Sequence, residues 1–271
     1  GPMFEMTSPH LTSRERVRLA LAHRDTDRVP IAMVCSGINE PAATAFDELL
    51  RRELRVSRED YLDKLLDVVP VAPPYTGPAL RPGYDIWGVR REPVSYGAAS
   101  YNEITGYPLA GAKNAGDIAR HAFPCVDWFD YGAMPDIVRK LQGEHERCLM
   151  MHNANVFESS WYMRGFEQFF MDMVLDPELA HAILRRVTDF HKAHFHRILE
   201  AVPGEIDLAF TADDLGSQQG LLMSLEMWGE FIKPYHMEIN RLVHEFGTKV
   251  IYHSDGAVME AVPGLIDMGI D

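Results

Sequence analysis

The chain has 271 residues, of which 46% are hydrophobic and 24% charged, as expected for a globular protein with a substantial core. Its formal net charge of −14 argues against a protein that binds nucleic-acid backbones, because such proteins concentrate Lys and Arg. No apolar run approaches the roughly 20 residues that cross a bilayer, and the N-terminus lacks a secretory pattern, so we expect a cytoplasmic protein without a membrane partner.

The length fits one α/β domain covering residues 1–271, since α/β barrels of about 250 residues commonly form a single domain. Gly1 and Pro2 resemble a protease-cleavage scar rather than part of the fold. The cysteines Cys35, Cys125 and Cys148 are odd in number and widely spaced, which predicts buried free thiols rather than disulfides.

The N-terminal half predicts helices around one early strand. Thr12 and Glu15 form a capping-box pattern that starts a helix ending near His23. The apolar run 29–35 predicts the first central strand, and residues 41–66 predict two helices, the second capped by Ser57. Several prolines exclude a regular helix over 70–82, and residues 85–105 predict a short β excursion or hairpin.

The C-terminal half alternates strands with helices. We expect strands at 148–153, 206–211 and 249–252, each followed by a helix, as in a parallel α/β fold. The helix after the first of these should span about 159–174. The next begins at Asp176-Pro177 and carries His191, His194 and His196, for which a solvated helix face is a better interpretation than a metal site.

Polar side chains follow these predicted strands. In a parallel fold the carboxyl ends of the strands meet at one edge, where ligands bind, so these residues should gather there. They are Cys35, Asn155, Glu158, Asp213, Asp214, Gln218, His253 and Asp255.

Several of these residues also have a purely structural interpretation. Adjacent carboxylates such as Asp213 and Asp214 are costly unless they are solvated, hydrogen-bonded or bound to a cation, but Asp also favours turns and caps. His253 and Asp255 can converge on one ion, although this spacing is weak evidence alone. Cys35 is a candidate ligand or nucleophile, or simply a small buried hydrophobe.

Several ordered motifs resemble the uroporphyrinogen decarboxylase superfamily over nearly the whole chain, and most resemble its branch of corrinoid-dependent methyltransferases. The resemblance implies a TIM-like (β/α)8 barrel with a pocket at the carboxyl ends of its strands. The motifs are Arg14–Val17 through Asp27–Pro30, Phe157-Glu158 with Arg164-Gly165, Asp213–Gly216, Phe231–Tyr235 and His253–Gly256.

The resemblance also implies a chemistry. Methyltransferases of that branch use zinc to bind and deprotonate a thiol, which accepts a methyl group from a methylcorrinoid protein. Carried over residue by residue, it makes His253 and Glu158 ligands of zinc or another divalent metal, and Asp255 an oxygen ligand where the pattern has cysteine.

The remaining residues take supporting roles in the same hypothesis. Asp213 and Asp214 are the catalytic candidates, which orient the substrate or a group next to the metal. Cys35, Asn155 and Gln218 are the substrate-binding candidates.

The chain departs from the family pattern in two further places. Residues 33–37 replace the arginine-containing stretch that holds substrate carboxylates in the decarboxylases, so we do not expect porphyrinogen decarboxylation. The sequence ends at Asp271, just after the helix that follows the His253 strand, so we expect the barrel to lack its last strands here. An open barrel edge would favour a homo-oligomer.

The leading hypothesis is therefore a methyltransferase-like enzyme acting on a small methylated compound, a thiol acceptor or a methylcorrinoid partner protein. One alternative is a metal-independent lyase or decarboxylase in which Asp213 or Asp214 serves as acid or base. The other is a barrel that binds a small molecule without turnover.

Overall fold

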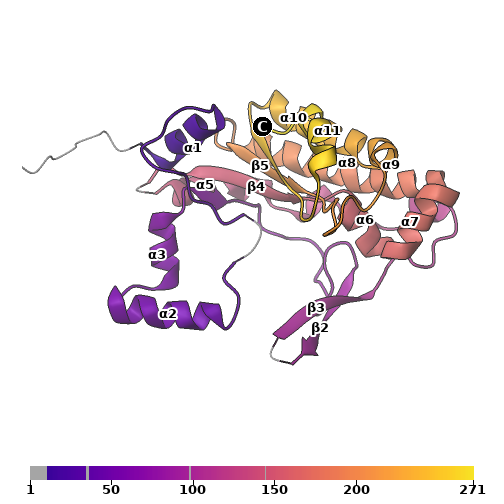
Figure 1. Ribbon diagram of the computed structural model, residues 1–271, viewed down its shortest axis with the longest axis horizontal. Helices are drawn as coiled ribbons and strands as arrows, with labels where there is room; N and C mark the ends of the chain where they lie inside the picture. Colours follow the sequence, from indigo (N-terminus) through magenta and orange to yellow (C-terminus); the bar gives the residue numbers. More distant parts are fainter. Residues whose placement is uncertain (1–10, 35–36, 98, 144) are drawn as a thin grey trace, which may run out of the picture.

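The computed structural model describes residues 11–34, 37–97, 99–143 and 145–271 (Figure 1). Four parallel strands form the central sheet in the order β1-β4-β5-β6, and two antiparallel strands form a separate hairpin. The strands are β1 (Val68–Pro70), β2 (Arg90–Tyr96), β3 (Ala99–Gly106), β4 (Cys148–Ala154), β5 (Leu208–Ala212) and β6 (Lys249–His253).

Helices follow most strands and cover the sheet. They are α1 (Ser13–Leu21), α2 (Ala42–Glu53), α3 (Arg58–Leu65), α4 (Ala115–Arg120), α5 (Met134–Gln142), α6 (Phe157–Arg164), α7 (Phe166–Leu175), α8 (Pro177–Ala201), α9 (Leu225–Phe231), α10 (Lys233–Glu245) and α11 (Val262–Asp267), with 3₁₀ turns η1 (Val126–Trp128), η2 (Tyr131–Ala133) and η3 (Met259–Ala261). In Figure 1, α2 and α3 extend away from the sheet, and the β2–β3 hairpin projects separately from it.

The main hydrophobic core lies between one face of the sheet and the helices α8 and α10. Leu149 and Met151 of β4 point to this side, together with Ala209 of β5 and Val250 of β6, and all four are buried. The long helix α8 contributes apolar residues along its length, as the hydrophobic spacing of the sequence requires.

Alternate residues of the same strands form a second cluster on the opposite face. Met150 and Phe210 are buried there, and Val17 of α1 packs against the amino-terminal part of this face. A sheet buried on both faces explains why its strands read as nearly continuous apolar runs. The described residues therefore build an α/β fold with an open parallel sheet, and a closed barrel is not formed by this part of the chain.

The predicted first strand at 29–35 is wrong over its described part. Residues 29–34 form no strand, and Val29 is 79% exposed. The strand beside β4 is instead β1, which the sequence analysis missed because prolines surround it. Residues 29–34 run close to it, since the Ile31 N–H donates to Asp67 just before β1. Cys35 lies outside the described residues.

Most predicted helix starts are confirmed by their caps. Thr12 accepts from the Glu15 N–H while Glu15 accepts from the Thr12 N–H, which is the predicted capping box. Ser57 and Asp176 cap α3 and α8. The single helix predicted at 159–174 is divided into α6 and α7.

The break between α6 and α7 comes from Gly165, whose φ of +98° ends the first helix. A glycine adopts this conformation at little cost, whereas most side chains do not.

The histidines of α8 are not on a solvated face, so that interpretation was wrong for His191 and His194. The His191 Nε2 lies 3.1 Å from the Asn155 carbonyl oxygen, and the His194 Nδ1 lies 2.7 Å from the Tyr131 hydroxyl. Burial lowers the pKa of each imidazole to about 4, and both are therefore neutral near pH 7. The buried-thiol prediction holds for Cys148, but Cys125 is exposed.

An ion-pair network holds α1 at the amino-terminal ends of β1 and β5. Arg14 and Arg18 both contact Asp207, which precedes β5. Arg16 pairs with Asp67, which precedes β1 and has a fully buried side chain. Although burial raises the pKa of Asp67, hydrogen bonds from Arg28 and other donors lower it overall.

Within the described ranges, no helix is both long and apolar enough to cross a membrane.

We expect Asp67→Asn to destabilise the fold by about 3–5 kcal/mol, because it breaks a buried, multiply bonded ion pair. Denaturant unfolding at pH 7 measures this change. Asp136→Asn is the control, since its partner Arg139 is as exposed as Asp136, and it should cost less than about 0.5 kcal/mol.

The ion pair between Asp67 and Arg16 also predicts how the free energy of unfolding depends on pH. The pKa of Asp67 is lowered in the folded state, so its contribution is present above the ordinary value near 4 and is lost as pH falls through the lowered value. The stability difference between parent and Asp67→Asn should therefore narrow only below about pH 4. A difference that already vanishes at pH 6 would contradict this assignment.

Candidate functional site

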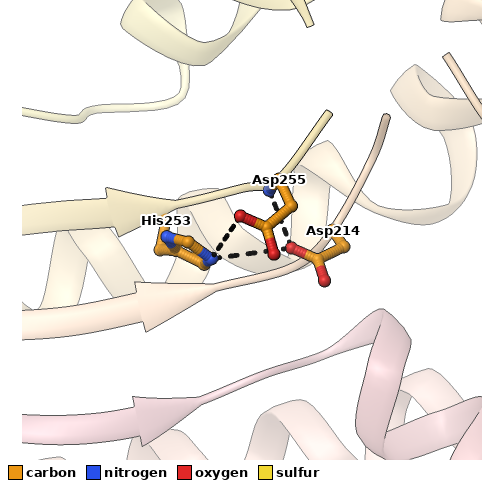
Figure 2. A group of neighbouring side chains, drawn as sticks. All are labelled: Asp214, His253 and Asp255. Atoms are coloured by element: carbon orange, nitrogen blue, oxygen red, sulfur yellow. Dashed lines mark hydrogen bonds and ion pairs between the residues drawn. The ribbon is translucent and has the colours of Figure 1, made fainter. Parts of the chain in front are cut away.

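Three polar side chains converge where β5 and β6 end (Figure 2). The His253 Nε2 lies 3.3 Å from the Asp255 Oδ1 and 3.8 Å from the Asp214 Oδ1. One potential ligand atom from each residue lies within 4.8 Å of the others. We call Asp214, His253 and Asp255 the His–Asp cluster. All three are at least partly exposed, so solvent and small molecules can reach them.

Backbone pairing brings this cluster together. Ala212 is in register with His253, and the Asp213 N–H donates to the His253 carbonyl oxygen at 3.1 Å, which extends the ladder one step past β5. The Asp255 N–H then donates to the Asp214 Oδ1 at 2.8 Å. A carboxylate oxygen retains another lone pair after accepting one hydrogen bond, so Asp214 can also face a cation.

The loops after β5 and β6 touch through glycines. A Cβ on Gly216 would lie 2.8 Å from both the Asp255 carbonyl oxygen and the Ala257 nitrogen. Gly256 has a φ of +83°, and a Cβ on it would lie 2.5 Å from the Gly216 carbonyl carbon. This approach leaves no room for a side chain, so the glycines fix the distance between the loops that carry Asp214 and Asp255.

Asp213 does not line the exposed site, because its side chain is fully buried. Its oxygens accept from the backbone N–H groups of Val156, Phe157 and Glu158 at 2.9–3.0 Å, and the His236 Nε2 lies 2.5 Å away. The first turn of α6 has no cap from its own N-cap side chain, so Asp213, which follows β5, supplies this function.

Glu158 makes hydrogen bonds with both Asp213 and Asp214. Its Oε1 accepts from the Asp214 N–H at 2.7 Å, and its Oε2 accepts from the Tyr162 hydroxyl at 2.7 Å. Burial, reinforced by the nearby negative charge of Asp213, raises the pKa of Glu158 above its ordinary value. Glu158 therefore holds a proton more readily than an ordinary glutamate does.

The structure thus gathers most of the predicted site residues and separates their roles. The sequence predicts Glu158 as the third metal ligand beside His253 and Asp255. In the structure, the third residue with a suitable ligand spacing is Asp214. Asn155 contacts Glu158 at 3.4 Å, and Gln218 is exposed on the loop after β5. Cys35 lies outside the described residues, so its predicted role stays a prediction.

Sequence reasoning missed three side chains that support this site. Tyr162 lies four residues after Glu158 on α6, a spacing that predicts contact on one helix face. The Tyr252 hydroxyl donates to the Asp213 carbonyl oxygen at 2.9 Å, and His236 contacts the Asp213 carboxylate from α10. No local pattern identifies these last two, because they depend on contacts between distant segments.

Comparisons with known proteins agree with this fold. The family model described as uroporphyrinogen decarboxylase (URO-D) matches residues 156–271, which contain the His–Asp cluster. No curated protein matches the sequence. A solved methyltransferase from Methanosarcina mazei has a similar fold, with a TM-score of 0.60 and 19% identity, covering 96% of this chain and 75% of that one. Residues 156–271 are therefore similar to the uroporphyrinogen decarboxylase family, and the chain shares its fold with that methyltransferase.

Proposed function

We propose that this protein is a methyltransferase-type enzyme whose His–Asp cluster holds a divalent metal. The convergence of Asp214, His253 and Asp255 at the carboxyl ends of β5 and β6 is the observation that carries the proposal. It lies where α/β folds place their ligands, within the segment matched by the superfamily model. The similar fold of the M. mazei methyltransferase supports the reaction class.

The donor set fits a catalytic metal. One imidazole and two carboxylates make three protein ligands, and catalytic zinc sites commonly use three and leave a position for water or substrate. The negative charges of Asp214 and Asp255 favour a cation at this position. Because the cluster contains oxygen where the methyltransferase pattern has a thiolate, its preference for zinc over other divalent ions is weaker.

Bound there, the metal would hold a thiol and lower its pKa, so that the thiolate could accept a methyl group from a small methylated compound or a methylcorrinoid partner. The residues of this chain would provide the surroundings. Asp214, His253 and Asp255 would bind the ion. Glu158, which accepts a hydrogen bond from the Asp214 N–H, would take up the proton that the thiol loses.

The neighbouring buried groups would keep this arrangement rigid. Asp213 holds the first turn of α6 and therefore the position of Glu158. Asn155 and Gln218 stay candidates for substrate contact. The lyase alternative loses one of its two candidates, because a fully buried Asp213 with four hydrogen-bonding partners cannot reach a substrate. Among the described residues, no contact specifically favours a metal-independent reaction at Asp214.

We expect His253→Ala to lower the affinity for zinc at least tenfold, because it removes one of three ligands. Elemental analysis after equilibrium dialysis measures bound metal, and competition with a chromophoric chelator gives the affinity. His196→Ala is the control, since that partly exposed histidine on α8 contacts Glu200 and Phe246 and is not a member of the His–Asp cluster. Equal zinc affinity in His253→Ala and the parent would refute the metal site.

Asp255→Cys is the complementary change. A thiolate is a softer ligand than a carboxylate, so this variant should bind zinc more tightly relative to manganese than the parent does. The same chelator competition with both ions measures the ratio. An unchanged ratio would mean that Asp255 does not contact the ion.

We also expect Gly216→Ala to weaken zinc binding at least tenfold, because the added Cβ would push the Asp255 loop away from Asp214. Gly229→Ala in α9 is a matched control, since its added Cβ meets no atom within 4 Å. Zinc titrations and thermal unfolding of both variants give the comparison. If Gly216→Ala folds and binds zinc like the parent, the contact between the loops does not set the cluster geometry.

A further inference from the structure

Strand β4 contains an irregularity at its carboxyl end, beside the His–Asp cluster. Met151 pairs with Ala209 and Ala154 pairs with Thr211, so two residues of β4, His152 and Asn153, oppose the single residue Phe210 of β5. This is the arrangement of a β-bulge, a feature that is common next to active sites and that redirects side chains.

The bulge changes which side chains point to each face. Met150 belongs to the cluster on the α1 side of the sheet, while Met151 and Ala154 belong to the main core on the other side. Without the extra residue, strict alternation would send Ala154 to the α1 side. Instead, His152 and Asn153 occupy the interval between two core-facing residues, and both are accessible at the strand end.

The backbone of Asn153 is unusual in its own right. Its φ of +73° lies in the left-handed region, which asparagine tolerates better than most residues but glycine adopts most easily. Among the described residues, neither the His152 nor the Asn153 side chain makes a hydrogen bond within the protein. Two polar side chains are thus presented at the strand end without a hydrogen-bonding partner among the described residues.

Their position relates them to the proposed site. Phe210, which opposes the bulge, pairs on its other side with Ile251 of β6, two residues before His253. The rings of Phe210 and His253 lie 6.3 Å apart. The bulge and the His–Asp cluster therefore flank the same end of β5, one from each neighbouring strand.

The negative charge at the carboxyl ends of the strands limits which ligands can bind between the β4 bulge and the His–Asp cluster. The segments 152–158, 211–218 and 252–257 contain Glu158, Asp213, Asp214 and Asp255 but no Lys or Arg. A substrate carboxylate or phosphate would find no basic side chain in these segments. Burial also lowers the pKa of His152, which keeps its imidazole neutral near pH 7. A neutral imidazole and an amide can each donate and accept hydrogen bonds.

We propose that His152 and Asn153 are substrate-contacting residues that bind an uncharged, oxygen-bearing group, such as a hydroxyl or ether, beside the His–Asp cluster. This inference rests on the proposed function in treating the strand ends as a substrate site. It goes further by assigning the substrate to the class of neutral oxygen compounds and by assigning its recognition to the bulge of β4.

Three nearly isosteric probes test the charge class: 2-methoxyethanol, methoxyacetate and 2-methoxyethylamine. NMR titration of metal-free protein at pH 7.5 follows the imidazole Cε1–H resonance of His152, which is assigned from its loss in His152→Ala. We expect 2-methoxyethanol to shift this resonance and to bind more tightly than methoxyacetate. The amine should bind through the carboxylates, whether or not His152 is present.

The variants test the residues. His152→Ala and Asn153→Gly should each weaken 2-methoxyethanol binding about fivefold, as expected for one lost hydrogen bond of about 1 kcal/mol. Glycine relieves the left-handed backbone, so Asn153→Gly should fold at least as well as the parent. His23→Gly is the matched control, because His23 also has a positive φ of 55° but lies at the end of α1, and it should bind the alcohol like the parent.

Several results would overturn the inference: no shift of the His152 resonance with the alcohol, equal binding by both variants and the parent, or tighter binding of methoxyacetate than of the alcohol. Because these titrations use no metal, they are independent of the zinc measurements on His253→Ala. A failed zinc site together with His152-dependent binding of the alcohol would refute the proposed metal chemistry and leave this inference standing. The reverse pattern would refute only this inference.

Discussion

The buried carboxylate of Asp213 is the constraint on which the candidate site depends. A buried, unsatisfied carboxylate is costly, and this one is satisfied by three backbone N–H groups at the start of α6 and by His236 of α10. Its own backbone joins β6 through His253 and Tyr252. A single residue therefore fixes the relative positions of the segments that carry Glu158, Asp214 and His253.

This arrangement concentrates negative charge at the carboxyl ends of the strands. Glu158 and Asp214 are joined through a backbone N–H, and Asp255 donates its own N–H to Asp214, so the loops are held together by hydrogen bonds rather than by opposite charges. A cation at the His–Asp cluster would offset the remaining repulsion. Burial, reinforced by the nearby negative charge of Asp213, raises the pKa of Glu158 at the same edge.

The two ends of the sheet differ in how they treat charge. At the amino-terminal ends, Arg14 and Arg16 meet buried aspartates in closed ion pairs that hold α1 in place. At the carboxyl ends, Asp214 and Asp255 face an imidazole and solvent, and the segments 152–158, 211–218 and 252–257 contain no Lys or Arg. This division, with stability at one end and chemistry at the other, is the usual arrangement of parallel α/β folds.

Local chemistry made much of the fold predictable. Thr12 and Ser57 cap helices as their neighbours in sequence required, because a cap is completed within four residues. The strands β4, β5 and β6 were predicted from their apolar runs, and the polar residues after them do meet at one edge, because parallel strands place all their carboxyl ends together. The parallel α/β class was thus contained in the sequence.

Tertiary contacts decided what local patterns could not. Residues 29–34 are apolar enough for a strand, but Val68–Pro70 pairs with β4 instead, since pairing depends on a partner far away in the sequence. The apolar side chains that surround His191 turned an expected surface residue into a buried one. Adjacent aspartates have the same local sequence signal, yet Asp213 is buried and Asp214 is partly exposed.

The sequence by itself determined which residues could carry chemistry and the end of the sheet on which they would lie. Only the tertiary structure decided that Asp213 holds α6, that Asp214 joins His253 and Asp255, and that a bulge presents His152 and Asn153 beside them. The physical reason is that burial, hydrogen-bond partners and strand register are set by segments tens of residues apart.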